Sequence, residues 1–361
     1  MKQQSVTSEK ILPALPEHLL PWYRANARDL PWRHTADPYR IWVSEIMLQQ
    51  TRVAAVLGYY ARFLEAFPMV EALAEADEER LLKLWEGLGY YSRARNLQKA
   101  ARCIAERGAF PDTYEDLLKL PGIGDYTASA IAAAAFGRPE PAVDGNVLRV
   151  ISRVLADRED IRQPAVKARM ERELKEIMPR ERTSQYNQGL IEVGAIVCVP
   201  GGEPRCAECP MESICLTRRQ GLWKEIPVRG ALKKRKVEEL TVCLIRRGKE
   251  VAIHKRPDTG LLASLYELPN VPGHLEPDQV PGAFGLSPDL VEAVEPLPAA
   301  KHIFSHVEWH MTGYVLLCRP SGPADFCWSD GRDFADKTVP TAFARFREEA
   351  LEHLERQEGS E

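Results

Sequence analysis

The sequence predicts two domains, an all-α domain followed by a smaller α+β domain. At 361 residues the chain is long enough to bury two hydrophobic cores. Through the first 220 residues, apolar side chains recur every three or four positions, which is the spacing of amphipathic helices. After residue 240 the spacing changes to two, which is typical of strands. A segment rich in Lys and Arg separates the two regions.

The first domain is expected to consist of helices separated by short breaks that contain Gly or Pro. Each expected helix carries apolar residues along one face, so that the helices can share a core. The expected helices are Arg40–Tyr59, Glu71–Gly87, Tyr91–Arg107, Tyr114–Leu120, Tyr126–Phe136, Asn146–Leu155 and Val166–Ile177.

The segment 223–238 is expected to be an exposed linker between the domains. It combines Pro227 and Gly230 with many cations. Two interpretations stay open, a solvated charged tether and a tether that also touches phosphates. The cations are Lys224, Arg229, Lys233, Lys234, Arg235 and Lys236.

The second domain is expected to begin with a β-hairpin. Leu240–Arg246 and Glu250–Lys255 alternate in the manner of strands, and Arg247–Lys249 predicts the turn between them. Val307–Arg319 predicts another long strand. An amphipathic C-terminal helix is indicated by Phe343, Phe346, Ala350 and Leu354.

The composition is that of a globular protein and argues against a membrane protein. Hydrophobic residues make up 45% of the chain and charged residues 28%, which are ordinary proportions. Residues 1–20 lack the apolar stretch of a secretory signal. The longest run of small apolar residues, Ser129–Phe136, is too short to cross a bilayer. We therefore expect a soluble, cytoplasmic protein of bacterial type with no membrane partner.

The net charge of −4 does not favour a nucleic-acid-binding protein, but the charge is unevenly distributed. Residues 1–240 carry 36 Lys and Arg against 33 Asp and Glu, a net +3. Residues 241–361 carry 12 against 19, a net −7. Because local patches rather than the total charge decide phosphate binding, nucleic acid is not excluded as a partner.

A glycine-containing turn lies between two expected helices at Leu120-Pro-Gly-Ile-Gly-Asp-Tyr-Thr127. Gly122 and Gly124 permit a tight turn whose backbone N–H groups face the start of the next helix, a geometry that binds phosphate. A plain helix–helix turn is the alternative. With its flanking residues the segment resembles the helix-hairpin-helix motif of the DNA base-excision glycosylases. The resemblance implies that Asp144, about twenty residues on, is the catalytic aspartate of that superfamily.

Four of the eight cysteines fall within eighteen residues, in a C-x7-C-x2-C-x5-C pattern. Four thiolates at this spacing suit a tetrahedral zinc ion or a [4Fe–4S] cluster, and the ligand chemistry does not choose between them. The four ligands would be Cys198, Cys206, Cys209 and Cys215. The remaining cysteines are expected to be ordinary core or strand residues, namely Cys103, Cys243, Cys318 and Cys327.

Two acids occupy contrasting local environments. Glu45 lies in the apolar run 41–48, where burial would raise its pKa and keep it protonated. Asp144 directly precedes the expected helix at Asn146, where the helix dipole favours its anion. An acid beside a carboxylate is the arrangement that cleaves glycosidic bonds. The alternatives are a surface glutamate and an N-cap aspartate, although capping and catalysis can share one carboxylate.

Longer motifs resemble one branch of this superfamily, the MutY-type adenine DNA glycosylases. The matching segments span the helical domain and are Arg28-Asp-Leu-Pro-Trp-Arg33, Trp42-Val-Ser-Glu-Ile-Met-Leu-Gln-Gln-Thr51, Trp85-Glu-Gly-Leu-Gly-Tyr-Tyr-Ser-Arg93 and Val143-Asp-Gly-Asn-Val147. The resemblance implies a glycosylase of base excision repair that removes adenine mispaired with 8-oxoguanine or guanine. It also implies that the four cysteines hold a [4Fe–4S] cluster, although the first gap is seven residues here and usually six.

The resemblance assigns roles to individual residues. Glu45 would protonate adenine N7, Asp144 would stabilise the sugar cation, and Tyr126 and Asn146 would support them. Tyr126 stands where bifunctional relatives carry a lysine, so little or no strand cleavage at abasic sites is expected. The extruded adenine would lie among Arg28, Leu30, Trp32, Arg33, Leu88 and Gln188. DNA contacts are expected from Gln50, Thr51, Tyr90, Gly122 and Gly124, although helix packing is an alternative role for Trp32, Leu88 and Tyr90.

The second domain resembles the Nudix-like domain that this branch carries. Gly260-Leu-Leu-Ala-Ser-Leu-Tyr-Glu-Leu-Pro269 supports the resemblance, and the glutamate-rich segment of active Nudix hydrolases is missing after it. Phe304-Ser-His306 resembles the family loop that meets the oxidised base. Ser305 would then hydrogen-bond N7–H and O8 of 8-oxoguanine, and an ordinary loop serine is the alternative.

The resemblance therefore predicts a fold of two domains and a DNA partner. The chain would begin with a helical helix-hairpin-helix domain at 1–222, followed by the linker 223–238 and a Nudix-like domain at 239–361. Within the helical domain, the helix-hairpin-helix motif would lie at about 114–136 and an iron–sulfur loop at 198–215. The protein would act as a monomer on double-stranded DNA at the nucleoid. The alternatives are an endonuclease III-like enzyme for another lesion, a non-catalytic iron–sulfur protein that binds damaged DNA, and a Nudix hydrolase.

Overall fold

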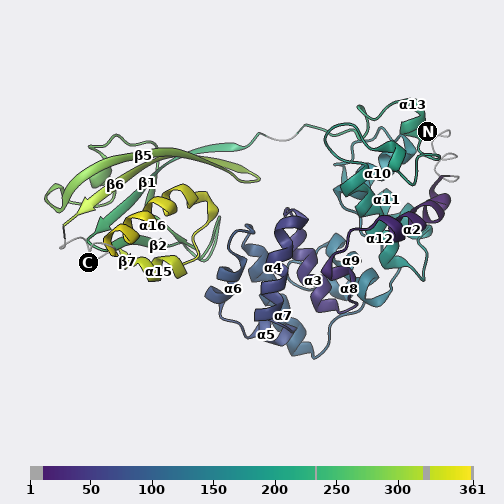
Figure 1. Ribbon diagram of the computed structural model, residues 1–361, viewed down its shortest axis with the longest axis horizontal. Coiled ribbons are helices and arrows are strands. Elements are labelled where there is room, and N and C mark those ends of the chain that lie inside the picture. The colour runs from purple at the N-terminus through teal and green to yellow at the C-terminus, as the bar shows by residue number, and fades with distance from the viewer. Residues whose placement is uncertain (1–10, 232–233, 320–325, 359–361) are drawn as a thin grey trace. The chain divides into compact units, whose positions relative to one another are not determined.

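The computed structural model describes residues 11–231, 234–319 and 326–358, which form two compact units (Figure 1). The first unit contains the residues up to Ala76 together with Asn96–Ala231. The second contains Asp77–Arg95 and the described residues after Ala231. Within the described ranges, every helix is too short or too polar to span a bilayer.

The first unit is built from helices, as predicted. Its main core lies where α2, α10, α11 and α12 meet, and α12 also packs on α9, while α3 packs on α4 and α9. The helices are α2 (Leu15–Asn26), α3 (Pro38–Leu48), α4 (Val53–Ala66), α5 (Val70–Ala74), α7 (Ser92–Arg107, which begins in the second unit), α8 (Tyr114–Leu117), α9 (Asp125–Phe136), α10 (Gly145–Leu155), α11 (Pro164–Glu176), α12 (Thr183–Glu192) and α13 (Leu216–Gln220).

Two expected helices are each broken in two. The segment 40–59 was expected to be continuous, but α3 ends at Leu48 and Gln50 has a left-handed backbone with φ of 61°. The segment 71–87 is interrupted before Asp77, whose side chain caps the short helix α6 (Glu78–Trp85) by accepting a 3.0 Å hydrogen bond from the Arg80 amide. Apolar residues continue at helical spacing on both sides of each break, so this spacing alone does not reveal the breaks.

The second unit is built on a mixed sheet with strand order β3-β2-β1-β6-β5, while β4 pairs with β1 and β7 pairs with β2. β1 and β6 run parallel, and the other pairs are antiparallel. The expected hairpin is present as β1 and β2. The strands are β1 (Lys236–Arg247), β2 (Glu250–Lys255), β3 (Tyr266–Glu267), β4 (Asn270–Pro272), β5 (Val291–Ile303), β6 (Val307–Cys318) and β7 (Cys327–Ser329).

The C-terminal helix α16 (Ala344–Glu358) covers one face of this sheet, beside α15 (Gly331–Asp336) (Figure 1). Phe346 on α16 is fully buried in the core that the two layers share. Gly313 on β6 allows this close approach, because a Cβ atom there would lie 2.3 Å from the Phe346 ring. A second, smaller core lies around Cys243 and Tyr314.

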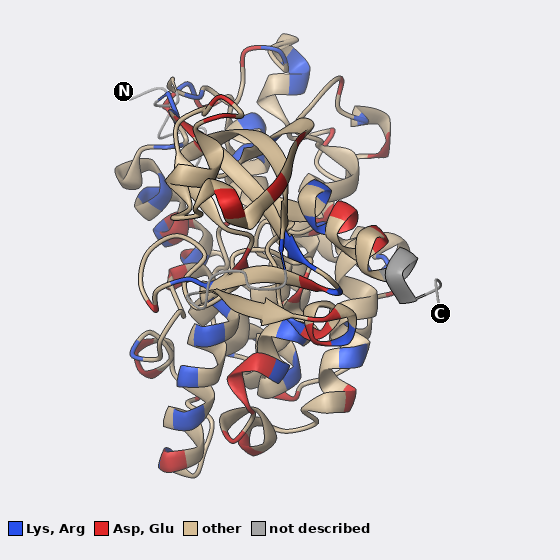
Figure 2. Ribbon diagram, turned by 90° about the vertical axis from the view of Figure 1, so that its left-hand side faces the viewer, with Lys and Arg blue, Asp and Glu red and all other residues tan. Residues whose placement is uncertain are grey.

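The segment around α6 belongs to the second unit through charged side chains. The Glu86 carboxylate forms a 2.9 Å ion pair with Arg347 on α16. Glu79 on α6 lies 3.1 Å from Lys255 on β2. Charges of both signs are interspersed along the ribbon (Figure 2), so an acidic total does not mean a uniformly acidic surface.

Two further expectations need correction. β1 begins at Lys236 rather than Leu240, because Lys236 pairs with Val307 at the start of the parallel ladder with β6. Residues 236–238 of the expected linker are therefore strand, and residues 232–233 of that linker lie outside the described residues. Cys103 is exposed on α7 and is neither a core nor a strand residue, whereas Cys243 and Cys318 are buried and Cys327 is an exposed strand residue.

Candidate active site

The helix α3 carries Glu45 into the interior of the first unit. The helix begins where the Asp37 side chain accepts a 2.9 Å hydrogen bond from the Tyr39 amide, with Pro38 in the first turn. Most of its other side chains are buried, so Glu45 is surrounded by apolar neighbours. These buried residues include Ile41, Trp42, Val43, Ile46 and Met47.

Burial raises the pKa of Glu45 to about 7, and the nearby charge of Asp144 adds to this rise. A hydrogen bond from Tyr126 and the charge of Arg33 act in the opposite direction. The side chain keeps some exposed surface, yet it is recessed enough for protein atoms to replace most of its hydration. Glu45 can therefore hold a proton at neutral pH and release it, as a general acid requires.

Asp144 is the N-cap residue of α10. Its Oδ1 atom accepts hydrogen bonds of 2.8 Å from the backbone amides of Asn146 and Val147. Its Oδ2 atom accepts a 2.7 Å hydrogen bond from the Asn146 side chain. These donors and the helix dipole stabilise the carboxylate anion and fix its orientation.

Tyr126 lies in the first turn of α9 and donates its hydroxyl hydrogen to Glu45. Its pKa is raised well above the ordinary value, first by burial and then by the charges of Glu45 and Asp144. The phenol therefore stays protonated and remains a hydrogen-bond donor. The structure thus brings together three predicted residues: Glu45 from α3, Tyr126 from α9 and Asp144 from the start of α10.

A buried cluster of charges lies on the Arg33 side of this site. Glu192, the last residue of α12, has no exposed side-chain surface. It accepts hydrogen bonds of 2.7 and 2.8 Å from the Arg28 guanidinium and of 2.6 Å from Arg33. Burial opposes the ionisation of Glu192, but the hydrogen bonds from the two arginines outweigh it and lower the pKa of Glu192 to about 2.

Glu192 is a functional candidate that the sequence analysis missed. Arg28 and Arg33 were predicted as pocket residues, but their shared carboxylate comes from a helix about 160 residues further along the chain. The available signal was a single acid in the apolar run 189–197. A charge in such a run is uncommon unless it is paired.

Other predicted pocket residues lie nearby in the first unit. Trp32 and Leu30 are buried, and the Trp32 ring meets Tyr60 edge to face at 5.3 Å between centroids. Gln188 on α12 accepts a hydrogen bond from the Tyr23 hydroxyl and donates a 3.1 Å hydrogen bond to Ser184. The amide of Gln188 is therefore held in one orientation.

The predicted hairpin turn requires glycine at Gly122. Its φ is 75°, and a Cβ atom there would lie 2.6 Å from that of Asn96. Gly124 is the N-cap residue of α9 and has open space where a Cβ would be. Gly122, Gly124 and Asp125 are all exposed, so the start of α9 is accessible, as a phosphate site requires.

The remaining predicted contacts lie on turns. Gln50 has φ of 61°, and Thr51 beside it donates a 3.3 Å hydrogen bond to the Gln49 carbonyl. In the second unit, Leu88 is buried, while Tyr90 is 47% exposed with φ of 47°. Ser305 is exposed in the turn between β5 and β6.

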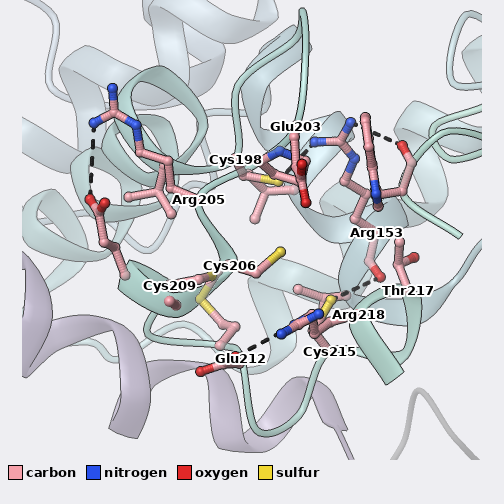
Figure 3. A pocket seen from close by; sticks show the side chains of 18 of the residues that line it. Arg153, Cys198, Glu203, Arg205, Cys206, Cys209, Glu212, Cys215, Thr217 and Arg218 are labelled. Atoms are coloured by element: carbon pink, nitrogen blue, oxygen red, sulfur yellow. Dashed lines mark hydrogen bonds and ion pairs between the residues drawn. The ribbon is translucent and has the colours of Figure 1, made fainter. Parts of the chain in front are cut away.

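The four clustered cysteines line one cavity of about 470 Å³ (Figure 3). Nη1 of Arg153 lies 3.3 Å from Sγ of Cys198, and Sγ of Cys215 donates to the Arg153 carbonyl at 3.4 Å. Arg149 donates to the Cys198 carbonyl at 2.8 Å. In the part of the chain that the structure describes, no three His, Cys, Asp or Glu side chains are grouped closely enough to hold a single ion.

Two family models match the chain. The HhH-GPD superfamily of base excision DNA repair proteins matches residues 43–180, which include Glu45, Tyr126 and Asp144. The NUDIX domain matches residues 241–349.

Curated relatives match most of the chain. The mouse adenine DNA glycosylase is 34% identical, over 92% of this chain and 77% of its own length. The human adenine DNA glycosylase is 33% identical, over 91% and 72%. The chain belongs to the adenine DNA glycosylase family. As a member of this family, of the MutY type, it is a DNA N-glycosylase of base excision repair that removes adenine.

Solved structures support the fold of this family member. A thermostable thymine-DNA glycosylase is 28% identical with a TM-score of 0.53, over 59% of this chain and 98% of that one. A trapped covalent intermediate of endonuclease III with DNA is 25% identical with a TM-score of 0.50, over 60% and 98%. Together with the HhH-GPD match these structures confirm the predicted helix-hairpin-helix domain, and the match to the NUDIX domain confirms the predicted Nudix-like domain.

Proposed function

We propose that this adenine DNA glycosylase acts as a monomer on duplexes in which adenine is mispaired with 8-oxoguanine or guanine, and that Glu45 and Asp144 carry the chemistry. The observation that carries the mechanism is the convergence of Glu45, Tyr126 and Asp144, with burial raising the pKa of Glu45 to about 7. A neutral carboxylic acid and an anion held by a helix N-terminus are the two groups that cleavage of an N-glycosidic bond needs.

In the proposed reaction, the adenine leaves the base stack and Glu45 donates its proton to N7. The bond between C1′ and N9 then breaks, and its electron pair goes to the base. The positive charge left on the sugar is stabilised by the carboxylate of Asp144, which the Asn146 side chain orients. Water adds to C1′, and Glu45 accepts the proton that this water releases.

The flipped base would be held by the pocket residues on the Arg33 side of Glu45. Leu30 and Trp32 offer apolar surface against which a purine can stack. Gln188 offers an oriented amide for the edge of the base. The pair of Arg28 and Arg33 on Glu192 keeps these groups in place without leaving a buried charge unpaired.

Two residues with strained backbone support the proposed wedge in the DNA. Gln50 and Tyr90 both have positive φ although neither is glycine. Such conformations are uncommon outside glycine and gather at functional sites. Gln50 in the first unit is therefore proposed to fill the space that the extruded base leaves, and the exposed Tyr90 in the second unit is proposed as a separate contact to the base stack.

The four cysteines fit a [4Fe–4S] cluster. They line a single cavity larger than one metal ion needs, and Arg153 approaches the Cys198 sulfur, where it would balance the negative charge of thiolate ligands. Cys198, Cys206, Cys209 and Cys215 would hold the cluster. It would supply a fixed fold for the loop 198–215, while the chemistry of base removal falls to Glu45 and Asp144.

One experiment tests the proposed substrate. The purified protein is incubated with duplexes that contain adenine opposite 8-oxoguanine, adenine opposite guanine, or thymine glycol. Alkali-dependent cleavage at the adenine, fastest opposite 8-oxoguanine, is expected. Equal rates on the two adenine duplexes would remove the proposed role of the oxidised base, and cleavage of the thymine glycol duplex alone would overturn the proposal.

A further inference from the structure

The turn 304–306 that carries Ser305 is held by few contacts of its own. It joins β5 to β6 and is closed by a 2.9 Å hydrogen bond from the Phe304 amide to the Val307 carbonyl. Ser305 and His306 are both exposed, and their side chains lie 3.3 Å from each other. A turn of this kind needs additional support if its serine is to meet a base in one fixed position.

Arg235, which directly precedes β1, and Lys236, the first residue of β1, supply that support. Nε of Arg235 donates a 3.1 Å hydrogen bond to the Phe304 carbonyl, directly before Ser305. The Lys236 amide donates to the His306 carbonyl at 3.3 Å, directly after Ser305. These two consecutive residues therefore hold the backbone of the turn on both sides of Ser305.

The register of the sheet explains why the two segments meet. Lys236 is paired with Val307 at the first step of the parallel ladder between β1 and β6. β1 therefore enters the sheet at the point where the turn ends. Two residues further along both strands, Glu238 accepts a 3.0 Å hydrogen bond from the Trp309 indole, and this ring packs on Phe304 at 4.9 Å between centroids.

The basic segment is also held at its other end, within the first unit. The Ile161 amide donates to the Val228 carbonyl at 3.2 Å, and Arg162 donates to the Gly230 carbonyl. Arg235 is one of the cations of the segment 223–238, for which two roles stayed open from the sequence: part of a solvated tether, or a contact to phosphate. In the structure its guanidinium has a partner inside the second unit.

We infer that Arg235 is a positioning residue for the turn 304–306 and that it contributes to selectivity for adenine opposite 8-oxoguanine. The inference rests on the proposed function, in which Ser305 meets the oxidised base. The hydrogen bond of Arg235 holds the peptide that precedes Ser305, so its loss would leave the serine hydroxyl free to sample other positions. Binding to the remainder of the DNA, and the chemistry at adenine, would not depend on it.

The test compares kcat/KM for adenine opposite 8-oxoguanine with kcat/KM for adenine opposite guanine. In Arg235→Met this selectivity ratio is expected to fall by roughly 2- to 10-fold, the range for one charge-assisted hydrogen bond in an exposed setting. The matched control is Lys234→Met, which removes the same charge from the neighbouring exposed residue. Its rates are expected to change equally on both duplexes, since a phosphate contact carries no information on the base.

Two further variants make the result decisive. Arg235→Lys can still donate to the Phe304 carbonyl, so it is expected to keep at least half of the wild-type selectivity ratio. Hydrogen exchange at the Phe304 amide is expected to stay slow in Arg235→Lys and to become faster in Arg235→Met. Equal ratios in Arg235→Met and wild type, or equal losses in Arg235→Met and Lys234→Met, would overturn the inference. Ser305→Ala distinguishes a failure of the inference about Arg235 from a failure of the proposed function. If this variant leaves the selectivity ratio unchanged, the proposed role of Ser305 itself fails.

Discussion

The side-chain amide of Asn146 donates a 2.7 Å hydrogen bond to Oδ2 of Asp144, while the backbone amide of the same residue donates to Oδ1 at 2.8 Å. One residue therefore holds both oxygens of the carboxylate proposed to face the sugar. The same carboxylate caps α10. Capping and catalysis can be separated by substitution, because asparagine caps a helix about as well as aspartate but carries no charge.

Asp144→Asn is accordingly expected to leave the fold intact and remove activity. Loss of the anion beside the developing cation should slow adenine release by about 10²- to 10⁴-fold. The midpoint of thermal unfolding should change little, because the cap remains. Single-turnover kinetics and circular dichroism check both expectations. If Asp144→Asn loses its fold together with its activity, Asp144 is chiefly structural. Asp37→Asn at the start of α3 is the control, because Asp37 caps a helix but has no proposed catalytic role.

Glu45→Gln is expected to slow adenine release by about 10²- to 10⁴-fold while binding to the mispaired duplex persists. For the wild type, the rate should fall as pH rises above about 7, because the proton needed at N7 is lost from Glu45. Rates measured between pH 5 and 9 provide the check. A flat wild-type profile through pH 7 would remove Glu45 as the proton donor.

The same carboxylic acid should affect stability in a pH-dependent way. The folded-state pKa of Glu45 is raised to about 7, so the folded chain binds the proton more tightly than the unfolded chain does. Its contribution to stability is complete below the ordinary glutamate pKa and is lost as pH rises through 7. Glu45→Gln should therefore match the wild type in urea unfolding at pH 4 and exceed it by about 1–3 kcal/mol at pH 8. Equal stabilities at pH 8 would contradict the raised pKa.

Glu192→Gln should destabilise the first unit, because two arginines would lose their shared anion. Removing one member of a buried ion cluster costs about 3–5 kcal/mol, and the partial exposure of Arg28 places the expectation at the lower end. Hydrogen bonds from Arg28 and Arg33 lower the pKa of Glu192 despite its burial, so its contribution is present above the ordinary glutamate pKa and lost as pH falls toward 2. Glu173→Gln, which removes a 3.5 Å surface pair with Arg169, should cost less than about 1 kcal/mol.

Tyr126 predicts base removal without strand cleavage, since a phenol cannot form a Schiff base with the sugar. Borohydride should trap no adduct between the wild type and abasic DNA, whereas Tyr126→Lys should yield one. Tyr126→Phe is the matched control without an amine. Because the hydrogen bond from Tyr126 lowers the pKa of Glu45, Tyr126→Phe should also shift the loss of activity to higher pH. A trapped adduct with the wild type would show that another residue supplies a nucleophilic amine.

Metal content tests the cysteine site. A [4Fe–4S] cluster gives four irons per chain and a broad absorption at roughly 400 nm, which zinc does not give. Replacing Cys206 by serine should lower the iron content and the folding yield together. Stoichiometric zinc with no visible absorption would mean that the four cysteines hold zinc and would overturn the proposed cluster.

The sequence by itself determined the features that local chemistry controls. The change of apolar spacing from three or four to two predicted the helical part and the later sheet, because side-chain periodicity follows from backbone geometry. Asp144 was recognisable as an N-cap and Glu45 as an acid in an apolar helix from their neighbours alone. The spacing of the four cysteines predicted that they would lie together, and all four line one cavity.

Tertiary structure decided what depends on residues distant in the chain. The Glu192 carboxylate that holds Arg28 comes from 164 residues away, and nothing in the local sequence names its partners. The break at Gln50 is invisible to periodicity, since apolar residues continue at helical spacing on both sides of it and α3 and α4 then pack on each other. The meeting of Arg235 with Phe304 follows from the register of a parallel ladder, which only the folded sheet defines. Local rules specify the elements, whereas long-range packing specifies which of their polar groups come together.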